Sequence, residues 1–95
     1  MILDDEAMRW ELDVLAAARR AGWTTYPQDR RSRRQHDPSC VLVRPGRLLL
    51  VYLRMNRRHP PALANVSAYL GVEAVLWTPA DRALVRVTLT SPSPP

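Results

Sequence analysis

The residues best suited to bind a charged partner are six arginines, which gather in two polar stretches. The first stretch, residues 27–38, lacks an apolar period and is predicted to be an exposed loop. The second covers residues 55–61. Because a guanidinium group presents paired donors that match phosphate oxygens, both stretches favour nucleic-acid binding over a merely solvated surface. The six residues are Arg30, Arg31, Arg33, Arg34, Arg57 and Arg58.

The composition of the chain explains which basic residue is used but not where it is placed. The formal net charge is +5, and all 14 basic residues are Arg, since the sequence contains no Lys. A bias toward Arg, Ala and Pro in the genome would account for that choice. The clustering of arginines on both sides of one apolar segment is therefore better evidence for phosphate binding than their number.

Other reactive side chains lack the partners that catalysis or zinc binding requires. Cys40 is the single cysteine, so it has no internal disulfide partner, and this favours a reducing compartment. His36 lies four residues before Cys40, and His59 lies beyond the next apolar segment, without the paired spacing of a zinc site. Ser39 lies near His36, but the sequence shows no third member of a triad. Neither a zinc site nor a nucleophilic enzyme is predicted.

The N-terminal part is predicted to form a helix that ends at Gly22, followed by a short strand over residues 23–26. Acidic residues at the start of the helix and Arg19 and Arg20 at its end suit the helix dipole. Glycine is the usual residue after a helix C-terminus. The positions expected to face the core are Met8, Leu12, Leu15 and Ala16.

The apolar segment between the basic stretches is predicted to be a β-hairpin. Two strands, residues 41–43 and 48–53, flank Pro45-Gly46, which fits the central positions of a type II turn. The second strand is continuously apolar, as expected when both faces are buried. Strand alternation places Leu50, Tyr52 and Arg54 on one face, and Leu49, Val51 and Leu53 on the other.

The last third of the chain predicts a helix over residues 62–70, a strand over residues 72–77 and an ambiguous end. Thr78 or Asp81 could cap a final helix, but the sequence ALVRVTLT suits a strand equally well. Residues 91–95 are expected to be a disordered Pro/Ser tail. The order of elements predicts a small α/β domain with a mixed sheet, occupying residues 1–90.

The length and hydropathy of the chain favour one soluble domain. A chain of 95 residues, 46% of them hydrophobic, suffices for a single core. No apolar run approaches the roughly 20 residues of a membrane-spanning helix, and the acidic N-terminus does not resemble a targeting signal. A cytoplasmic protein without membrane association is expected.

Several strings of the sequence together resemble one nuclease family. The strings are AARRAGWTTY, LVRPGRLLLVYLR, PPALANVSAYL and VLWTPAD, in that order. They resemble the VRR-NUC group of the PD-(D/E)xK nucleases, which is common in phages and mobile elements, from about Glu6 to about Asp81. The resemblance implies a small restriction-endonuclease-like domain, in which a mixed sheet with a central hairpin is flanked by helices.

The departures from the family pattern coincide with its catalytic residues. The family places a metal-binding Asp and Glu at the positions of Ser39 and Tyr52, and a catalytic Lys at the position of Arg54. A family Gln falls near Leu63. The resemblance therefore implies a nuclease fold that has lost its active site and needs no cofactor, because hydrolysis of a phosphodiester relies on a metal held by carboxylates.

Three functions remain open from the sequence. The first is DNA binding without cleavage through the six arginines and Arg54, with Tyr52 either stacking on a base or, as we favour, packing in the core. The second is a protein-interaction module that binds a host or viral partner or forms a homodimer. An exposed apolar patch would favour it, for which Trp10, Trp77 and Val85 are the candidates. Trp23 and Trp77 are nevertheless expected in the core, because both lie in predicted strands.

The third function is an active endonuclease with displaced metal ligands. Glu6 and Asp37 are the weak candidates for holding Mg²⁺ or Mn²⁺ in that case. Even together they leave the carboxylate of the second hairpin strand unreplaced, and Asp37 fits a turn before Pro38 more readily than a metal site. A pseudonuclease is therefore the favoured hypothesis.

Overall fold

The computed structural model describes residues 2–29, 31, 37–58 and 71–92. Within these ranges the chain forms two α-helices, four strands and one turn of 3₁₀-helix. In chain order they are α1 (Ile2–Arg20), β1 (Thr24–Pro27), β2 (Cys40–Arg44), β3 (Arg47–Leu53), β4 (Glu73–Trp77), η1 (Pro79–Asp81) and α3 (Arg82–Thr90).

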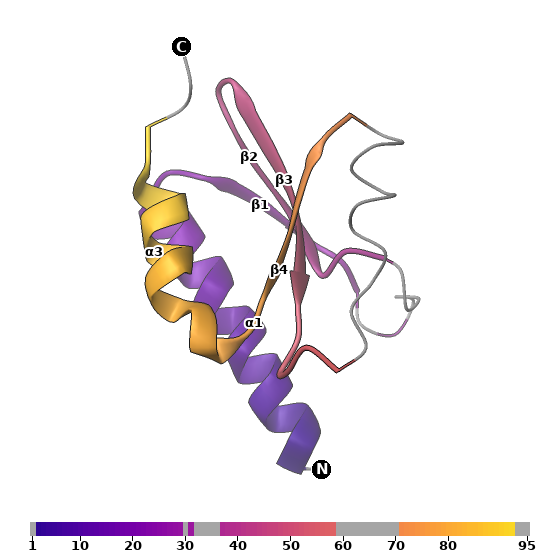
Figure 1. Cartoon of the computed structure of the whole chain (residues 1–95). Helices are drawn as coiled ribbons and strands as arrows, with labels where there is room; N and C mark the ends of the chain where they lie inside the picture. The colour runs from indigo at the N-terminus through magenta and orange to yellow at the C-terminus, as the bar shows by residue number, and fades with distance from the viewer. Residues whose placement is uncertain (1, 30, 32–36, 59–70, 93–95) are drawn as a thin grey trace.

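The four strands form one mixed sheet in the order β1-β2-β3-β4. β2 is antiparallel to both β1 and β3, and β4 runs parallel to β3. The β2–β3 hairpin therefore occupies the centre of the sheet. Both described helices lie against the same face (Figure 1). The prediction of a small α/β domain with a mixed sheet and a central hairpin is confirmed at this level.

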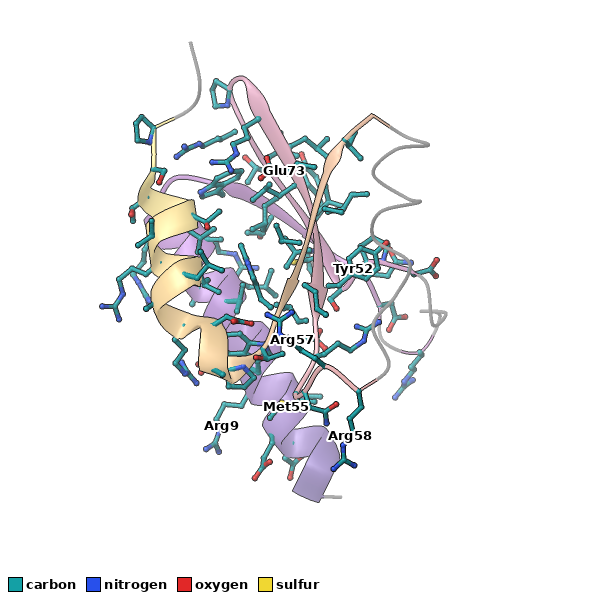
Figure 2. All side chains as sticks on the ribbon, viewed as in Figure 1. Arg9, Tyr52, Met55, Arg57, Arg58 and Glu73 are labelled. Atoms are coloured by element: carbon teal, nitrogen blue, oxygen red, sulfur yellow. The ribbon has the colours of Figure 1, made fainter. Side chains whose placement is uncertain are left out.

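The hairpin has two distinct ends, which organise the rest of the molecule. Its turn end contains Pro45 and Gly46, and β4 begins there with Glu73. Its open end is where β3 leaves the sheet toward Met55 and Arg58, on the opposite side of the molecule (Figure 2). Gly46 has a φ of 81°, as the predicted type II turn requires of its third residue.

The end of α1 is fixed by a Schellman motif around Gly22. The N–H of Gly22 donates to the carbonyl of Arg19, and the N–H of Trp23 donates to that of Ala18. Gly22 has a φ of 93°, which a residue with a side chain rarely adopts. The predicted stop at this glycine is confirmed, and it turns the chain directly into β1.

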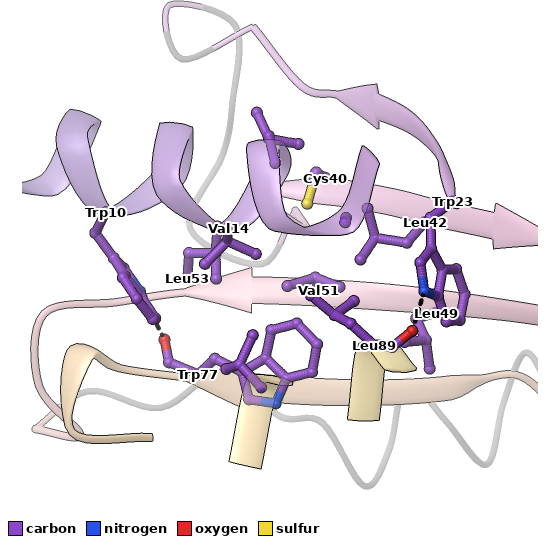
Figure 3. Close-up of a cluster of buried hydrophobic side chains, with 13 residues drawn as sticks. Trp10, Val14, Trp23, Cys40, Leu42, Leu49, Val51, Leu53, Trp77 and Leu89 are labelled. Atoms are coloured by element: carbon purple, nitrogen blue, oxygen red, sulfur yellow. Dashed lines mark hydrogen bonds between the residues drawn. The ribbon is translucent and has the colours of Figure 1, made fainter. Parts of the chain in front are cut away.

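The core lies between the helices and the sheet (Figure 3). Leu42, Leu49 and Val51 of the hairpin are completely buried. Two buried indole groups each donate a hydrogen bond to a backbone carbonyl of another element. Trp10 Nε1 donates to Trp77 O at 3.3 Å, and Trp23 Nε1 donates to Leu89 O at 2.8 Å. These contacts tie α1 to β4, and β1 to α3.

The predicted core face of α1 is wrong in two of its four positions. Met8 and Leu12 are 47% and 57% exposed, whereas Trp10, Val14 and Ala18 are buried. The helix offers two apolar stripes, and burying the one that contains Trp removes more apolar surface from water. Leu15 borders both stripes and is buried, as predicted.

The apolar patch suggested for a protein partner is also wrong. Trp10, Trp77 and Val85 are 3%, 2% and 4% exposed, so all three belong to the core of this chain. They lie on α1, β4 and α3, and the packing of these elements on one another covers them. The expectation that Trp23 and Trp77 are core residues is confirmed.

The ambiguous C-terminal segment is helical. Thr78 and Asp81 cap η1. Thr78 N donates to Asp81 Oδ2 at 2.8 Å, as in a capping box, and Asp81 N donates to the backbone carbonyl of Thr78 at 2.8 Å in the 3₁₀ turn. α3 then buries Val85 and Leu89 at helical spacing. Ser91, expected to belong to the tail, instead closes this helix, because its N–H donates to Val87 O.

Three other expectations can be compared with the structure only in part. The second hairpin strand is buried on both faces from Val51 to Leu53, but Leu48 is 40% exposed because it adjoins the turn. The helix expected over residues 62–70 lies outside the described residues. Within the described part of the chain, no helix is long and apolar enough to cross a membrane.

Candidate nucleic-acid interface at the open end of the hairpin

Ser39 lies beside Tyr52 at the open end. It directly precedes β2, whose first residue, Cys40, pairs with Val51. Ser39 N donates to Val51 O at 2.8 Å, and Ser39 Oγ accepts from Leu53 N–H, so Ser39 contacts the residues on both sides of Tyr52. The two positions expected to form one site from the family resemblance are therefore neighbours across the open end.

The hydroxyl of Ser39 has a structural role at this end. Ser39 is 1% exposed, and its Oγ accepts a hydrogen bond of 2.9 Å from the backbone N–H of Leu53. That N–H lies at the last position of β3, where the ladder ends. The hydroxyl therefore takes the place of a backbone acceptor, and this explains a polar residue in a buried strand end.

Tyr52 is buried and neutral. It is 1% exposed and lies on the side of the sheet away from α1 and α3 (Figure 2). Burial raises the pKa of its hydroxyl, Arg54 works in the opposite direction, and Asp37 adds to the rise. The phenol therefore carries no charge at neutral pH. The expectation that Tyr52 packs rather than stacks on a ligand agrees with this burial.

Arg54 covers the open end beside Tyr52. Its guanidinium carbon lies 6.0 Å from the centre of the Tyr52 ring, and its Nη1 donates to Leu53 O at 3.1 Å. The backbone N–H of Arg54 donates to Trp77 O at 3.1 Å, which anchors the residue to the end of β4. A half-buried cation thus occupies the position where the family has its catalytic Lys.

Arg57 and Arg58 lie on the short loop that follows β3 (Figure 2). Arg57 Nη2 lies 2.6 Å from Asp81 Oδ2, although 55% of the Arg57 side chain remains exposed. Arg58 is exposed, and its backbone N–H donates to Asn56 Oδ1 at 2.9 Å in an Asx turn. The turn fixes the backbone of Arg58 without engaging its guanidinium group.

The carboxylate of Asp81 connects this loop to the start of α3. It accepts hydrogen bonds from the Thr78 N–H, the Thr78 hydroxyl and Arg57. The Thr78 N–H makes the largest contribution to lowering the pKa of this carboxyl, and the Thr78 hydroxyl and Arg57 lower it further. The sequence contains the signal for the cap, Thr-x-x-Asp, but the pairing with Arg57 depends on the tertiary structure.

The first basic stretch is described only in part. Arg31 is exposed, and its backbone N–H donates to Asp29 Oδ1 at 3.0 Å, in a second Asx turn. This arrangement matches that of Arg58. The remaining residues predicted for the site lie outside the described ranges: Arg30, Arg33, Arg34 and Leu63.

The two candidate metal ligands lie on different elements. Glu6 is exposed on α1, and Asp37 is half-buried just before β2, close enough to Tyr52 to influence its pKa. Among residues 2–29, 31, 37–58 and 71–92, no three His, Cys, Asp or Glu side chains are grouped so as to hold a metal ion.

Comparisons with protein families, curated proteins and solved structures found no match to this chain.

Proposed function

We propose that this protein binds DNA through the arginines at the open end of the hairpin and does not cleave it. In this proposal the chain is a degenerate VRR-NUC-like domain with a restriction-endonuclease-like fold. The mixed sheet with a central hairpin is compatible with such a fold, and the order of the sequence strings supports the family relationship.

The observation that carries the proposal is the pair of neutral residues, Ser39 and Tyr52, at the open end. They lie beside each other where the family has two carboxylates, and both are 1% exposed. A catalytic magnesium site normally uses one or two carboxylates. A hydroxyl already bonded to Leu53 N–H and a buried phenol do not supply the negative charge that such a site needs.

The charge around this end favours phosphate instead. The sequence contains no Asp or Glu between Asp37 and Glu73. Arg54, Arg57 and Arg58 outnumber the two carboxylates described at this end, which are Asp37 near Tyr52 and Asp81 paired with Arg57. Each phosphate that an arginine neutralises releases a counterion from DNA, so binding of this kind is strong at low salt and steeply weakened by added salt. Replacing carboxylates by neutral residues removes repulsion between the protein and the backbone of DNA.

The test compares two double variants that remove the same charge from different faces. Arg31→Ala/Arg58→Ala changes two exposed arginines whose backbones are held by Asx turns. Arg20→Ala/Arg86→Ala changes two exposed arginines on the helices. Binding of a labelled duplex is followed by fluorescence anisotropy between about 50 and 200 mM salt.

The first double variant is expected to bind about tenfold more weakly and to lower the salt slope by about 2, since each lost phosphate contact lowers it by about 1. The second is expected to bind like the wild-type protein. Equal losses of affinity in both double variants would mean that net charge, and not the open end, determines binding. Absence of binding at low salt would refute the proposal.

Exposed apolar residues on α1 favour protein binding as the second candidate function. Met8 and Leu12 lie one turn apart, and both project from the domain surface, at 47% and 57% exposure. Contiguous exposed apolar surface marks contact sites, and this pair contributes to such a surface on one face of α1. A homodimer through this stripe predicts a sedimentation coefficient that rises with protein concentration and no longer does so in Met8→Ser/Leu12→Ser. A concentration-independent monomer would exclude self-association.

An active endonuclease is the enzymatic alternative, and it is tested directly. It requires that Asp37 act as a displaced ligand, so that Mg²⁺ or Mn²⁺ supports cutting and Asp37→Ala abolishes it. We expect a shift of the DNA in a gel without cleavage, with either metal. Metal-dependent cutting that Asp37→Ala removes would overturn the assignment of a pseudonuclease.

A further inference from the structure

A groove between α1 and α3 lies on the helical face of the domain, apart from the open end of the hairpin. Its volume is about 350 Å³, which falls within the range of roughly 300–1,000 Å³ that is usual for small-molecule sites. The side chains of Val14, Ala17, Val85 and Leu89 line its floor. Three of them belong to the buried core, so the floor is rigid.

Three arginines line the same groove from both helices. Arg82 and Arg86 lie one turn apart on α3, and Arg20 lies in the last turn of α1. Arg82 is held in place, because its guanidinium carbon lies 5.0 Å from the centre of the Trp10 ring and its Nη2 lies 3.4 Å from Asp13 Oδ2. The rim is therefore partly pre-organised.

The guanidinium groups of Arg20 and Arg86 have no ion-pair or hydrogen-bond partner among the residues that the structure describes, and both are exposed. Among the described residues that line the groove, Asp13 is the single acidic one. Three positive charges and one negative charge leave an excess of two. The chemical complement of this rim is a compact group with two negative charges and several acceptor oxygens.

A phosphate monoester has these properties. It carries a charge of about −1.5 to −2 at pH 7 because its second pKa is about 6, and it presents three acceptor oxygens. Arginine binds such oxygens with two parallel hydrogen bonds. A carboxylate or a phosphodiester has only one negative charge and would leave part of the positive charge unmatched.

We infer that the groove between α1 and α3 binds a small organic phosphate monoester, whose phosphate lies against Arg20, Arg82 and Arg86 and whose apolar part lies against the core residues of the floor. This site is separate from the proposed DNA interface, so the inference does not depend on DNA binding. Its ligand differs from DNA in charge per phosphate and in the use of an apolar floor.

The test uses phenyl phosphate as the probe and titration calorimetry of the full chain at pH 7.5. Phenyl sulfate, which has one negative charge, serves as the matched probe. Inorganic phosphate, which has no apolar part, tests how much the apolar floor contributes to the affinity. The two double variants described above are compared with the wild-type protein, together with Ala16→Leu, which places a larger side chain in the groove without changing its charge.

Phenyl phosphate is expected to bind at least about fivefold more tightly than phenyl sulfate or inorganic phosphate. Its advantage over the sulfate is expected to disappear near pH 5, where the monoester carries one charge. Arg20→Ala/Arg86→Ala is expected to weaken binding at least about tenfold, since each charge-assisted hydrogen bond contributes about 1.5–3 kcal/mol. Ala16→Leu is expected to abolish binding, and Arg31→Ala/Arg58→Ala is expected to leave it unchanged.

Three results would overturn the inference. They are no saturable binding, equal binding of inorganic phosphate, and insensitivity to both groove variants. Weaker DNA binding in Arg20→Ala/Arg86→Ala would instead make the groove part of a nucleic-acid surface and would also count against it. If DNA does not bind at all while phenyl phosphate binds in the groove, the proposed function fails and this inference stands.

Discussion

The two ends of the β2–β3 hairpin use the same residue type in different ways. At the turn end, the guanidinium carbons of Arg44 and Arg47 lie 4.5 Å and 5.8 Å from the centre of the Trp23 ring. Arg44 also donates to the carbonyl oxygens of Leu89 and Ser91 at the C-terminus of α3. Arg47 pairs with Glu73 at 3.0 Å. The arginines of this end hold β1, β4 and α3 together.

At the open end, the arginine side chains are less engaged in contacts within the protein. Arg57 pairs with Asp81 but keeps more than half of its side chain exposed. Arg58 projects from a loop whose Asx turn fixes only its backbone. The comparison teaches that clustering of arginine does not by itself indicate phosphate binding. The exposed fraction that remains beside an aromatic ring or a carboxylate decides whether the guanidinium group is available to a ligand: Arg47 keeps 18%, whereas Arg57 keeps 55% and Arg82 keeps 60%.

The largest expected effect at the turn end follows from Trp23→Ala. This change leaves a cavity in the core, removes the hydrogen bond to Leu89 O and takes away the ring under Arg44. The free energy of unfolding, measured with urea, is expected to fall by about 3–5 kcal/mol. Tyr26→Ala on the same strand changes a side chain that is 57% exposed and serves as the control. Similar losses of stability in Trp23→Ala and Tyr26→Ala would contradict a special role of the turn end.

Ser39→Ala tests the structural role of the hydroxyl at the open end. The buried N–H of Leu53 would lose its acceptor, so the free energy of unfolding is expected to fall by about 1–3 kcal/mol. Ser91→Ala is the control, because the Ser91 hydroxyl shares the acceptor Val87 O with the Ser91 N–H and is less buried. A stability equal to that of the wild-type protein would mean that Ser39 is free for another role.

Arg58→Ala and Arg47→Ala form a matched pair across the two ends, since each removes one positive charge. Arg58→Ala is expected to lower the salt slope of DNA binding by about 1 and to leave stability unchanged. Arg47→Ala is expected to leave DNA binding unchanged and to cost about 0.5–1 kcal/mol through the lost pair with Glu73. The reverse pattern would indicate that DNA binds at the turn end instead.

Asp81→Asn is expected to have a small effect with a defined pH dependence. The hydrogen bond from Thr78 N–H lowers the pKa of Asp81 in the folded protein. The carboxylate therefore stabilises the fold fully above its unfolded pKa of about 3.9, and this contribution is lost as the pH falls through the lower, folded value. The variant is expected to be about 1 kcal/mol less stable than the wild-type protein at pH 7.

The difference between Asp81→Asn and the wild-type protein is expected to shrink as the pH falls below about 4, because protonation then removes the same charge from both proteins. Urea unfolding at several pH values between 7 and 3 measures this difference. A difference that stays constant over the range would show that the ionised carboxylate does not contribute to the cap.

Short-range signals gave reliable predictions in this chain. Pro45-Gly46 specifies a turn because glycine readily adopts the positive φ that the turn needs. Gly22 ends α1 for the same reason. Strand alternation correctly placed Leu49, Val51 and Leu53 on one face of β3, and the structure shows that this face contributes to the core. In each case the preference lies in the residue itself or in its immediate neighbours along the chain.

Predictions that depended on distant partners were less successful. Met8 and Leu12 have the spacing of a core face, but α3 and the sheet pack on the neighbouring stripe that includes Trp10. The ambiguity of ALVRVTLT was resolved by the capping box and by the burial of Val85 and Leu89 against α1 and the sheet. Neither outcome can be read from local pattern, because both depend on which surface another element covers.

The sequence by itself determined α1 and the four strands, the turn between the central strands and the absence of carboxylates from the interval between Asp37 and Glu73. Tertiary structure decided which arginines are engaged, by placing Trp23 beside Arg44 and Asp81 beside Arg57. It also brought Arg20 and Arg86 to one groove. The physical reason is that backbone preferences act between neighbours in the chain, whereas electrostatic and packing interactions act between neighbours in space.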